Sequence, residues 1–456
     1  MKDIFDYVLQ LVSGMFPFVL LCLAGVYFTV KTKAVQVRKF FCAIKTALCV
    51  DKSLGSSFGA VCNSLSATIG TGNIAGVAFA ISVGGAGAVF WMWISAFFSM
   101  AIKAVEIGVA LLYRKQRNGE YYGGPMHYIK MRGGKILSGI SVVFALSGLG
   151  ATFFTGNLTQ VNACVSVMGD NFYLRLFMGV LIFILVATVI MGGAKKITRF
   201  TTIVLPFMAV LYIVLCLAVI FKNYDLIDDA FLSIFKGAFS PHAVTGGAVG
   251  SLSTAIIAGA QKGVFSNEAG MGTSGMAYAS VQDADPYKQG LFGIFEVFVD
   301  TLLICTLTAL TILCSSVIIN YGTAASSELV ERAFSTVYGG FSSVSLAIML
   351  CLFAVSSIIG WAFYGINFAE FLFGKKGKRL FCLIYPPICL LGAFASTDFT
   401  WHTAEFFNGI MLIINVTAVW LLSGKAIAVL KGDKNGNKDS GNTKCIRKQS
   451  SGANIR

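Results

Sequence analysis

Charged residues are scarce in this chain: Asp, Glu, Lys and Arg make up 12% of its 456 residues. A soluble protein of this length carries about twice that fraction. Hydrophobic residues account for 56% of the chain and are spread along nearly all of it. These two observations exclude an ordinary soluble globular protein and predict an all-α polytopic membrane protein.

The signatures of common enzymes and nucleotide-driven machines are also missing. The chain contains no GxxxxGK[ST] loop and no HExxH, and the histidines map to predicted loops or span ends: His127, His242 and His402. The twelve cysteines include no CxxC pair, so they are expected to be buried hydrophobes. We therefore predict a protein that is not an enzyme, and an ion gradient would have to drive any uphill transport.

Long apolar runs predict about eleven transmembrane helices, because a crossing needs about 20 apolar residues. The first run, near Phe16 to Val30, has no small-residue cleavage site after it, so we expect a span and not a removed signal peptide. The predicted spans are 12–30, 57–83, 87–113, 136–164, 172–191, 200–221, 246–279, 290–317, 342–372, 379–395 and 404–430.

The basic residues predict the orientation of these spans. Lysine and arginine cluster after the first, third, fifth and ninth spans and again in the tail, which is one side of the membrane if eleven spans are counted. The net charge of +14 is thus explained by topology, with no nucleic-acid partner. We expect a plasma-membrane protein of the bacterial or archaeal inner membrane, with its N-terminus outside and its C-terminus cytoplasmic. The polar tail, 431–456, is predicted to be disordered.

Two spans are interrupted by glycine and polar residues at mid-depth. The second span contains "SATIGTGNIAGVAF" (66–79) and the seventh contains "GVFSNEAGMGTSG" (263–275). Close helix packing through small residues four positions apart would explain either interruption alone, and Gly72 and Gly76 have this spacing. Matching interruptions five spans apart instead favour two broken helices that form a transporter's midplane site.

This pattern predicts a 5+5 inverted repeat of the leucine-transporter type. Its predicted parts are an accessory helix and basic loop (1–53), a first repeat of spans two to six (54–225), a second repeat of spans seven to eleven (226–430) and the tail (431–456).

Five stretches closely resemble the alanine or glycine:cation symporter family. They are "IGTGNIAGVAFAISVGGAGAVFWMW", "GGPMHYI", "GVFSNEAGMG", "FVDTLLICTLTAL" and "SSIIGWAFYG". The resemblance extends from about Leu54 to about Trp420. It implies a sodium-coupled importer of a small neutral amino acid, alanine or glycine in size, with the sodium ion (Na+) as the driving co-substrate.

The candidate substrate-binding residues belong mainly to the two interruptions. An amino-acid carboxylate needs N–H donors, which an unwound glycine-rich segment supplies, and the ammonium needs carbonyl or hydroxyl oxygens. A membrane-buried amide such as that of Gln160 also serves simply to bond neighbouring helices, and a membrane Trp is commonly a packing residue. The candidates are Thr71, Gly72, Asn73, Gln160, Phe265, Ser266, Asn267 and, as a size-limiting wall, Trp361.

The resemblance places one sodium ion between the second and ninth spans. Sodium prefers oxygen ligands, as other hard cations do. The sodium ligands that the resemblance implies are the backbone carbonyls of Ser66 and Ile69 and the hydroxyls of Ser356 and Ser357. The alternative for each serine is that its hydroxyl donates to the carbonyl four residues earlier in its own helix.

Buried charges in membrane spans are functional candidates. Lys103 and Glu106, three apart, are expected to neutralise one another. Glu268 is expected to brace the seventh-span break or to bond Asn73, and Glu296 and Asp300 have no assigned role. The alternatives to sodium symport are a proton-coupled or ion-independent exchanger of the same fold and a non-transporting channel or receptor.

Overall fold

The computed structural model describes residues 12, 14–49, 57–117, 119–167, 169, 171–240, 252–323 and 325–432. Of the tail predicted to be disordered (431–456), only Lys431 and Gly432 are among the described residues. His242 is not among them.

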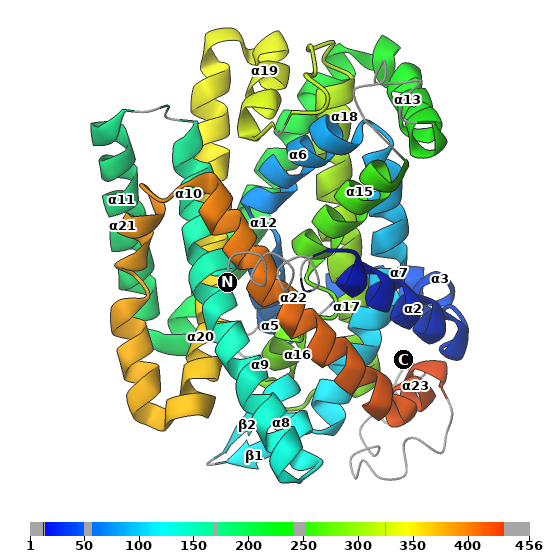
Figure 1. Ribbon diagram of the computed structural model, residues 1–456, viewed down its shortest axis with the longest axis vertical. Helices are drawn as coiled ribbons and strands as arrows, with labels where there is room; N and C mark the ends of the chain where they lie inside the picture. Colours follow the sequence, from blue (N-terminus) through cyan, green and yellow to red (C-terminus); the bar gives the residue numbers. More distant parts are fainter. Residues whose placement is uncertain are drawn as a thin grey trace, which may run out of the picture.

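The first half of the chain is almost entirely helical (Figure 1). Its elements are α2 (Met15–Lys31), α3 (Val35–Arg38), α4 (Phe40–Leu48), α5 (Ser57–Thr68), η1 (Thr71–Asn73), α6 (Ala75–Gly84), α7 (Ala88–Leu112), β1 (Lys115–Arg117), β2 (Glu120–Tyr122), α8 (Pro125–Met131), α9 (Lys135–Phe153), η2 (Phe154–Leu158), α10 (Thr159–Ser166), α11 (Phe172–Ile190) and α12 (Gly193–Lys222). Strands β1 and β2 form a short antiparallel hairpin.

The second half continues with helices. Its elements are η3 (Tyr224–Leu226), α13 (Ile227–Phe239), α15 (Leu252–Asn267), α16 (Thr273–Ala279), α17 (Pro286–Val297), η4 (Phe298–Cys305), α18 (Thr306–Leu313), α19 (Ser327–Tyr338), η5 (Gly339–Phe341), α20 (Ser342–Ile384), α21 (Ile388–Gly392), α22 (Thr397–Leu422) and α23 (Gly424–Lys431). Figure 1 shows α22 crossing the front of the bundle diagonally, with α2 to its right.

The helices confirm a multi-pass membrane architecture. Within the described ranges, seven helical stretches are long and apolar enough to cross a membrane, and α5 with η1–α6 adds a pair bent by 58°. Other predicted spans correspond to shorter helices, such as α2, and α20 continues from the predicted ninth span into the tenth through a bend at Gly374 (φ 66°). Helix α12 exposes the apolar side chains of Ile203, Phe207 and Val210, as expected for a helix against lipid.

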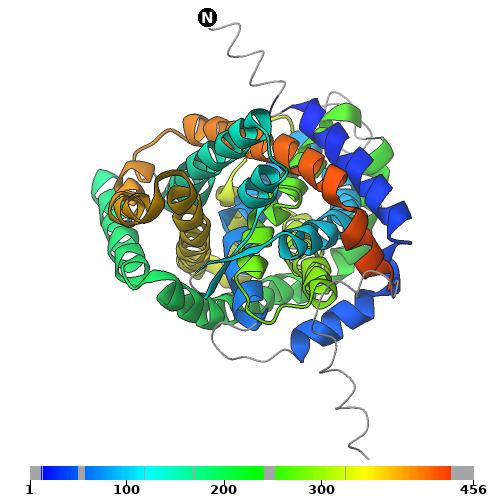
Figure 2. The same ribbon diagram turned by 90° about the horizontal axis from the view of Figure 1, so that it is seen from below.

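Small residues bring the central helices into close contact. A Cβ added to Gly259 of α15 would collide with the carbonyl of Ala88 at the start of α7, and one added to Gly360 of α20 would lie 2.6 Å from the Ala67 nitrogen of α5. Glycine at these positions allows backbone to pack on backbone. Polar side chains are consequently held in the centre of the bundle, while α11 and α12 form an outer wall (Figure 2).

Replacing Gly259 by alanine should therefore destabilise the bundle. The added methyl group has no space against the α7 backbone, and overpacking costs about 1–3 kcal/mol. The measurement is the thermal unfolding midpoint in detergent, followed by tryptophan fluorescence. Gly139→Ala is the matched control, since a Cβ there meets no atom within 4 Å. Equal midpoints for the two variants would contradict this packing.

Candidate functional site

The first predicted interruption is a true break in the helix. Helix α5 ends at Thr68, Gly70 is extended (φ −136°, ψ −164°), a single 3-10 turn covers Thr71–Asn73, and α6 begins at Ala75. A Cβ on Gly70 would lie 2.6 Å from the Ser357 hydroxyl oxygen and 2.8 Å from Gln160 Oε1. The lack of a side chain at Gly70 thus lets α20 and α10 approach the unwound backbone.

Side chains bond two of the backbone donors at this break. The Gly70 N–H donates to Asn73 Oδ1 (2.9 Å). The Thr71 N–H and hydroxyl both donate to Gln160 Oε1, at 3.0 and 2.9 Å. Gly72 is the only partly exposed residue of the 3-10 turn. Gln160 therefore lies directly on the broken segment.

The same break frees backbone carbonyls. In a continuous helix the carbonyls of Ser66 and Ile69 would accept from the N–H groups four residues later. Here the Gly70 N–H bonds the Asn73 side chain and the Asn73 N–H bonds the Gly70 carbonyl (3.1 Å). The two carbonyls predicted to bind sodium are thus released from their helical partners.

Three serine hydroxyls accompany these carbonyls. Ser357 donates to the Ala67 carbonyl across the α5–α20 contact, at 2.7 Å. The hydroxyl oxygens of Ser66 and Ser356 are buried and have no hydrogen-bond partner within the described residues. The α5–α20 contact therefore gathers oxygen atoms with unused bonding capacity, which is the ligand type that a hard cation prefers.

The second predicted interruption is also confirmed. Helix α15 ends at Asn267, and α16 begins at Thr273 after residues in left-handed conformations: Glu268 (φ 54°), Gly270 (φ 83°) and Gly272 (φ 85°). The Glu268 carboxylate accepts from the Thr273 hydroxyl (2.7 Å). Of the two expectations for Glu268, bracing the unwound segment is the one that the structure bears out.

The two breaks meet at the Asn73 side chain. Its Nδ2 donates to the Ser266 hydroxyl of α15 (2.9 Å) and to Asp300 Oδ1 of η4 (2.8 Å). Ser266 in turn donates to Asp300 Oδ2 (2.7 Å), and Thr308 donates to the Asn73 carbonyl (2.8 Å). All four side chains are buried. Asp300, which the sequence left without a role, thus links the two broken helices.

The expected neutralisation of Lys103 by Glu106 is wrong. Lys103 Nζ instead pairs with Glu296 Oε2 (3.0 Å) and donates to the Asn267 carbonyl (2.8 Å) at the end of α15. Glu106 accepts from the Gly272 N–H (3.2 Å) and from Asn415 (3.0 Å). The i, i+3 spacing suggested an ion pair along one helix, but each side chain bonds to groups on neighbouring helices instead. Both flank the second break.

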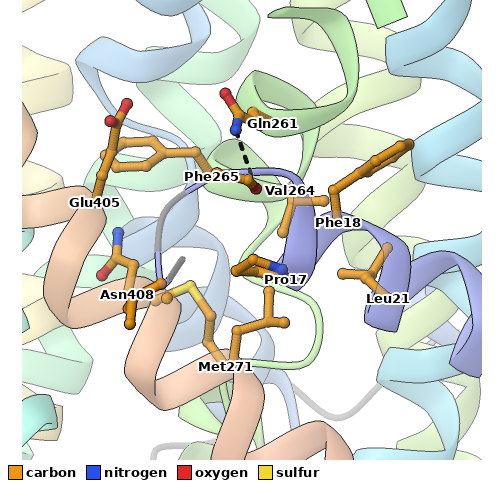
Figure 3. A pocket seen from close by; sticks show the side chains of 13 residues that line it. Pro17, Phe18, Leu21, Gln261, Val264, Phe265, Met271, Glu405 and Asn408 are labelled. Carbon is orange, nitrogen blue, oxygen red and sulfur yellow. Dashed lines mark hydrogen bonds between the residues drawn. The ribbon is translucent and has the colours of Figure 1, made fainter. Parts of the chain in front are cut away.

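An aromatic and ionic cluster covers the outer side of Phe265. The Phe265 ring lies against Gly72, where an added Cβ would be 3.7 Å from ring atom Cδ1, and packs on Trp401 at 5.0 Å between ring centroids. Lys262 Nζ lies 4.4 Å from the Trp401 ring centroid and pairs with Glu405 of α22 (3.0 Å). Figure 3 shows Phe265 and Glu405 at one end of an apolar pocket between α2, α15 and α22.

Among the other residues singled out in the sequence, Asn267 lies beside the junction of the two breaks, whereas Trp361 and the described histidines lie apart from it. Asn267 donates to the Thr301 hydroxyl (3.2 Å) and accepts from the Ala269 N–H (3.0 Å). Trp361 is fully buried against Gly156 of η2 and Tyr364, and among the described residues it makes no hydrogen bond or ring contact with either break. His402 is exposed in the first turns of α22. Outside the spans, burial and the nearby charges of Lys115 and Lys130 lower the pKa of His127 to about 4.

A similar overall fold is present in a solved structure. The crystal structure of MhsT in complex with L-phenylalanine matches 82% of this chain and 97% of its own, with a TM-score of 0.56 and 14% identity. The chain thus has the multi-pass fold of the leucine-transporter type. The chain belongs to the sodium:alanine symporter family, whose pattern it matches over residues 1–447.

Relatives in other organisms agree with this assignment. The sodium/alanine symporter AgcS of Methanococcus maripaludis is 38% identical over 92% of this chain and 94% of its own. An uncharacterized transporter of Haemophilus influenzae is 36% identical, with coverages of 88% and 89%. The probable sodium/glutamine symporter GlnT of Bacillus subtilis is 35% identical, with coverages of 91% and 86%. The chain is accordingly an amino-acid symporter by family.

Removing the Lys103 charge should strongly destabilise the protein. In Lys103→Gln, Glu296 would remain buried without its cation, and breaking a buried pair in this way costs about 3–5 kcal/mol. The double variant K103Q/E296Q removes both charges and should recover much of that loss. Thermal unfolding in detergent measures both effects.

Lys378→Gln is the control, because its pair with Glu370 (3.6 Å) is partly exposed and is expected to contribute below about 1 kcal/mol. A K103Q variant as stable as K378Q, or a double variant no better than K103Q alone, would refute the buried pair.

Proposed function

We propose that this protein is a sodium-coupled symporter that imports small neutral amino acids, alanine or glycine, by alternating access. The observation that carries the proposal is the junction of the two broken helices, where Asn73 bonds Ser266 at 2.9 Å. A polar, partly unwound centre inside an apolar bundle is expensive unless it binds something. The name of the Methanococcus relative, a sodium/alanine symporter, supports the substrate and the ion.

The substrate carboxylate is proposed to bind at Thr71, Gly72 and Asn73. Backbone N–H groups at a helix start attract an anion, and Gly72 lets the ligand approach the main chain closely. Gln160 positions this segment through its two bonds to Thr71. A ligand oxygen that takes the Thr71 N–H would replace Gln160 Oε1, so we assign Gln160 a place in the site.

The ammonium group is proposed to bind freed oxygens of the second break. In a continuous helix the Phe265 carbonyl would accept from the Ala269 N–H, but that N–H bonds Asn267 Oδ1 (3.0 Å). The Phe265 carbonyl is thus released, while Lys103 bonds the Asn267 carbonyl. The Phe265 carbonyl and the Ser266 hydroxyl would thus be the acceptors for the ammonium group, opposite the N–H donors of the first break.

Bulky side chains are proposed to set the size limit. Phe265 lies against Gly72, where an added Cβ would be 3.7 Å from the ring, and Trp361 packs beside Gly156. An apolar wall discriminates against one extra methylene by about 1–3 kcal/mol. This favours alanine or glycine over larger neutral amino acids.

Sodium is proposed to bind the carbonyls of Ser66 and Ile69 with the hydroxyls of Ser356 and Ser357. The ion would join α5, on one side of the first break, to α20. Coupling requires that sodium and substrate both bind one conformation better than the other. An ion that orders the Gly70–Asn73 segment meets this condition, because the substrate uses the N–H groups of the same segment.

The proposed orientation in the membrane follows from the basic loops. The plasma membrane with the N-terminus outside and the C-terminus cytoplasmic places the lysine- and arginine-rich loops inside. An inward sodium gradient would then drive uptake.

The main experiment is uptake of labelled alanine into proteoliposomes. We expect accumulation with an inward sodium gradient and none with a pH gradient alone. Competition by unlabelled glycine should be strong and competition by leucine weak. Equal uptake under both gradients would instead support the proton-coupled or ion-independent exchanger, and an absence of saturable counterflow would support a channel or receptor.

The sodium ligands are tested by Ser356→Ala. Losing one oxygen ligand should raise the sodium concentration for half-maximal uptake about tenfold, the equivalent of about 1.4 kcal/mol. Ser345→Ala on the same helix is the control, since its buried hydroxyl donates to the Ser342 carbonyl of its own helix (2.9 Å). If S356A and S345A have the same sodium dependence, Ser356 is not a ligand.

The first break is tested by Gly70→Ala. The new methyl group would lie 2.6 Å from the Ser357 oxygen and 2.8 Å from Gln160 Oε1, so we expect uptake to fall at least about tenfold, or 1.4 kcal/mol. Gly139→Ala again serves as the control. Wild-type uptake by G70A would contradict the tight packing of the unwound segment.

A further inference from the structure

A cavity of about 840 Å³ lies away from the two helix breaks. It is lined by the end of α11, the start of α12, the bent part of α20 and the β1–β2 hairpin. Helix α11 lies at the left edge of the bundle in Figure 1, and Figure 2 shows α11 and α12 along its outer side. The cavity is therefore at the rim of the membrane-spanning region, on the face where the basic loops gather.

One side of the cavity is cationic. Gly374 bends α20 (φ 66°), and the cations that follow the bend line the cavity: Lys375, Lys378 and Arg379. Lys378 pairs with Glu370 (3.6 Å). Lys375 and Arg379 are exposed, and neither makes an ion pair or hydrogen bond among the described residues. Two cationic side chains are thus available to a ligand.

The other side of the cavity is apolar. It is formed by Phe183, Ala187 and Ile190 of α11 and by Leu383 of α20, whose side chain is 72% exposed. A soluble anion would gain nothing from this surface, whereas a molecule with a hydrocarbon chain would bury it.

We infer that this cavity binds the headgroup and upper acyl chains of an anionic phospholipid from the surrounding leaflet. Lys375 and Arg379 would hold the phosphate, and the α11 residues would contact the acyl chain. Basic pockets between transmembrane helices near the membrane surface bind such headgroups. The inference is independent of which amino acid or ion is transported.

The carboxylates in the cavity wall do not oppose this assignment. Glu370 is paired with Lys378, and Glu120 accepts a hydrogen bond from the Tyr122 hydroxyl (2.7 Å). The three cations outnumber the two carboxylates that line the cavity, so the wall has a net positive charge.

The test is native mass spectrometry of the full-length, delipidated protein titrated with phosphatidylglycerol or phosphatidylcholine. The wild type should retain one phosphatidylglycerol molecule more tightly than the rest and show no such preference for phosphatidylcholine. In K375Q/R379Q, which keeps the Lys378–Glu370 pair, that binding should weaken about thirty-fold, because each cation near the surface contributes about 1 kcal/mol.

The matched control is K31Q/K45Q, which removes two exposed lysines from another predicted cytoplasmic segment. It should bind phosphatidylglycerol as the wild type does. Equal losses in the two double variants would show a general charge effect and overturn the site. Competition by soluble glycerol phosphate as effective as that of phosphatidylglycerol would also overturn it, since the apolar wall would then contribute nothing. Alanine uptake need not change, so failure here is separate from failure of the proposed function.

Discussion

The structure depends on one constraint: backbone groups released by two helix breaks must be satisfied inside an apolar bundle. An unsatisfied group in hydrocarbon costs several kcal/mol. The protein meets this cost with buried side chains from several helices, including Gln160 on Thr71, Ser357 on the Ala67 carbonyl and Lys103 on the Asn267 carbonyl. The backbone oxygens and N–H groups that these side chains leave unbonded lie close to the two breaks. They are the groups available to a ligand, so the broken helices form a binding site.

The network also explains why an ion and a substrate would influence each other. Asn73 belongs to the first break, Ser266 to the second, and Asp300 accepts hydrogen bonds from both. Any movement of one broken helix relative to the other must break or exchange these bonds, so the arrangement favours a small number of discrete states. Two ligands that contact opposite ends of the same short segment would each bias that choice. Glu296, through its ion pair with Lys103, and Glu106, through the hydrogen bond it accepts from the Gly272 N–H, support the second break.

Much of this could be predicted from the sequence, because glycine and polar residues inside apolar runs are a strong signal. The breaks at Gly70–Asn73 and Glu268–Gly272 follow that expectation. The partners of the buried charged residues could not be predicted, because helical spacing indicates only contacts within one helix. Lys103 pairs with Glu296, and Glu106 accepts a hydrogen bond from Asn415, both on other helices. Asp300 and Glu296 had a visible signal, acids four apart in an apolar helix, but their partners depend on packing. Trp361 packs on Gly156, a contact that no local pattern encodes.

The most direct measurement of the central claim is an experimental density map of the protein bound to alanine in sodium. The account predicts alanine density between the two breaks, with its carboxylate at the N–H groups of Thr71–Asn73, its ammonium toward Phe265 and Ser266, and an ion between α5 and α20. Alanine elsewhere in the bundle, with no density touching either break, would contradict the account.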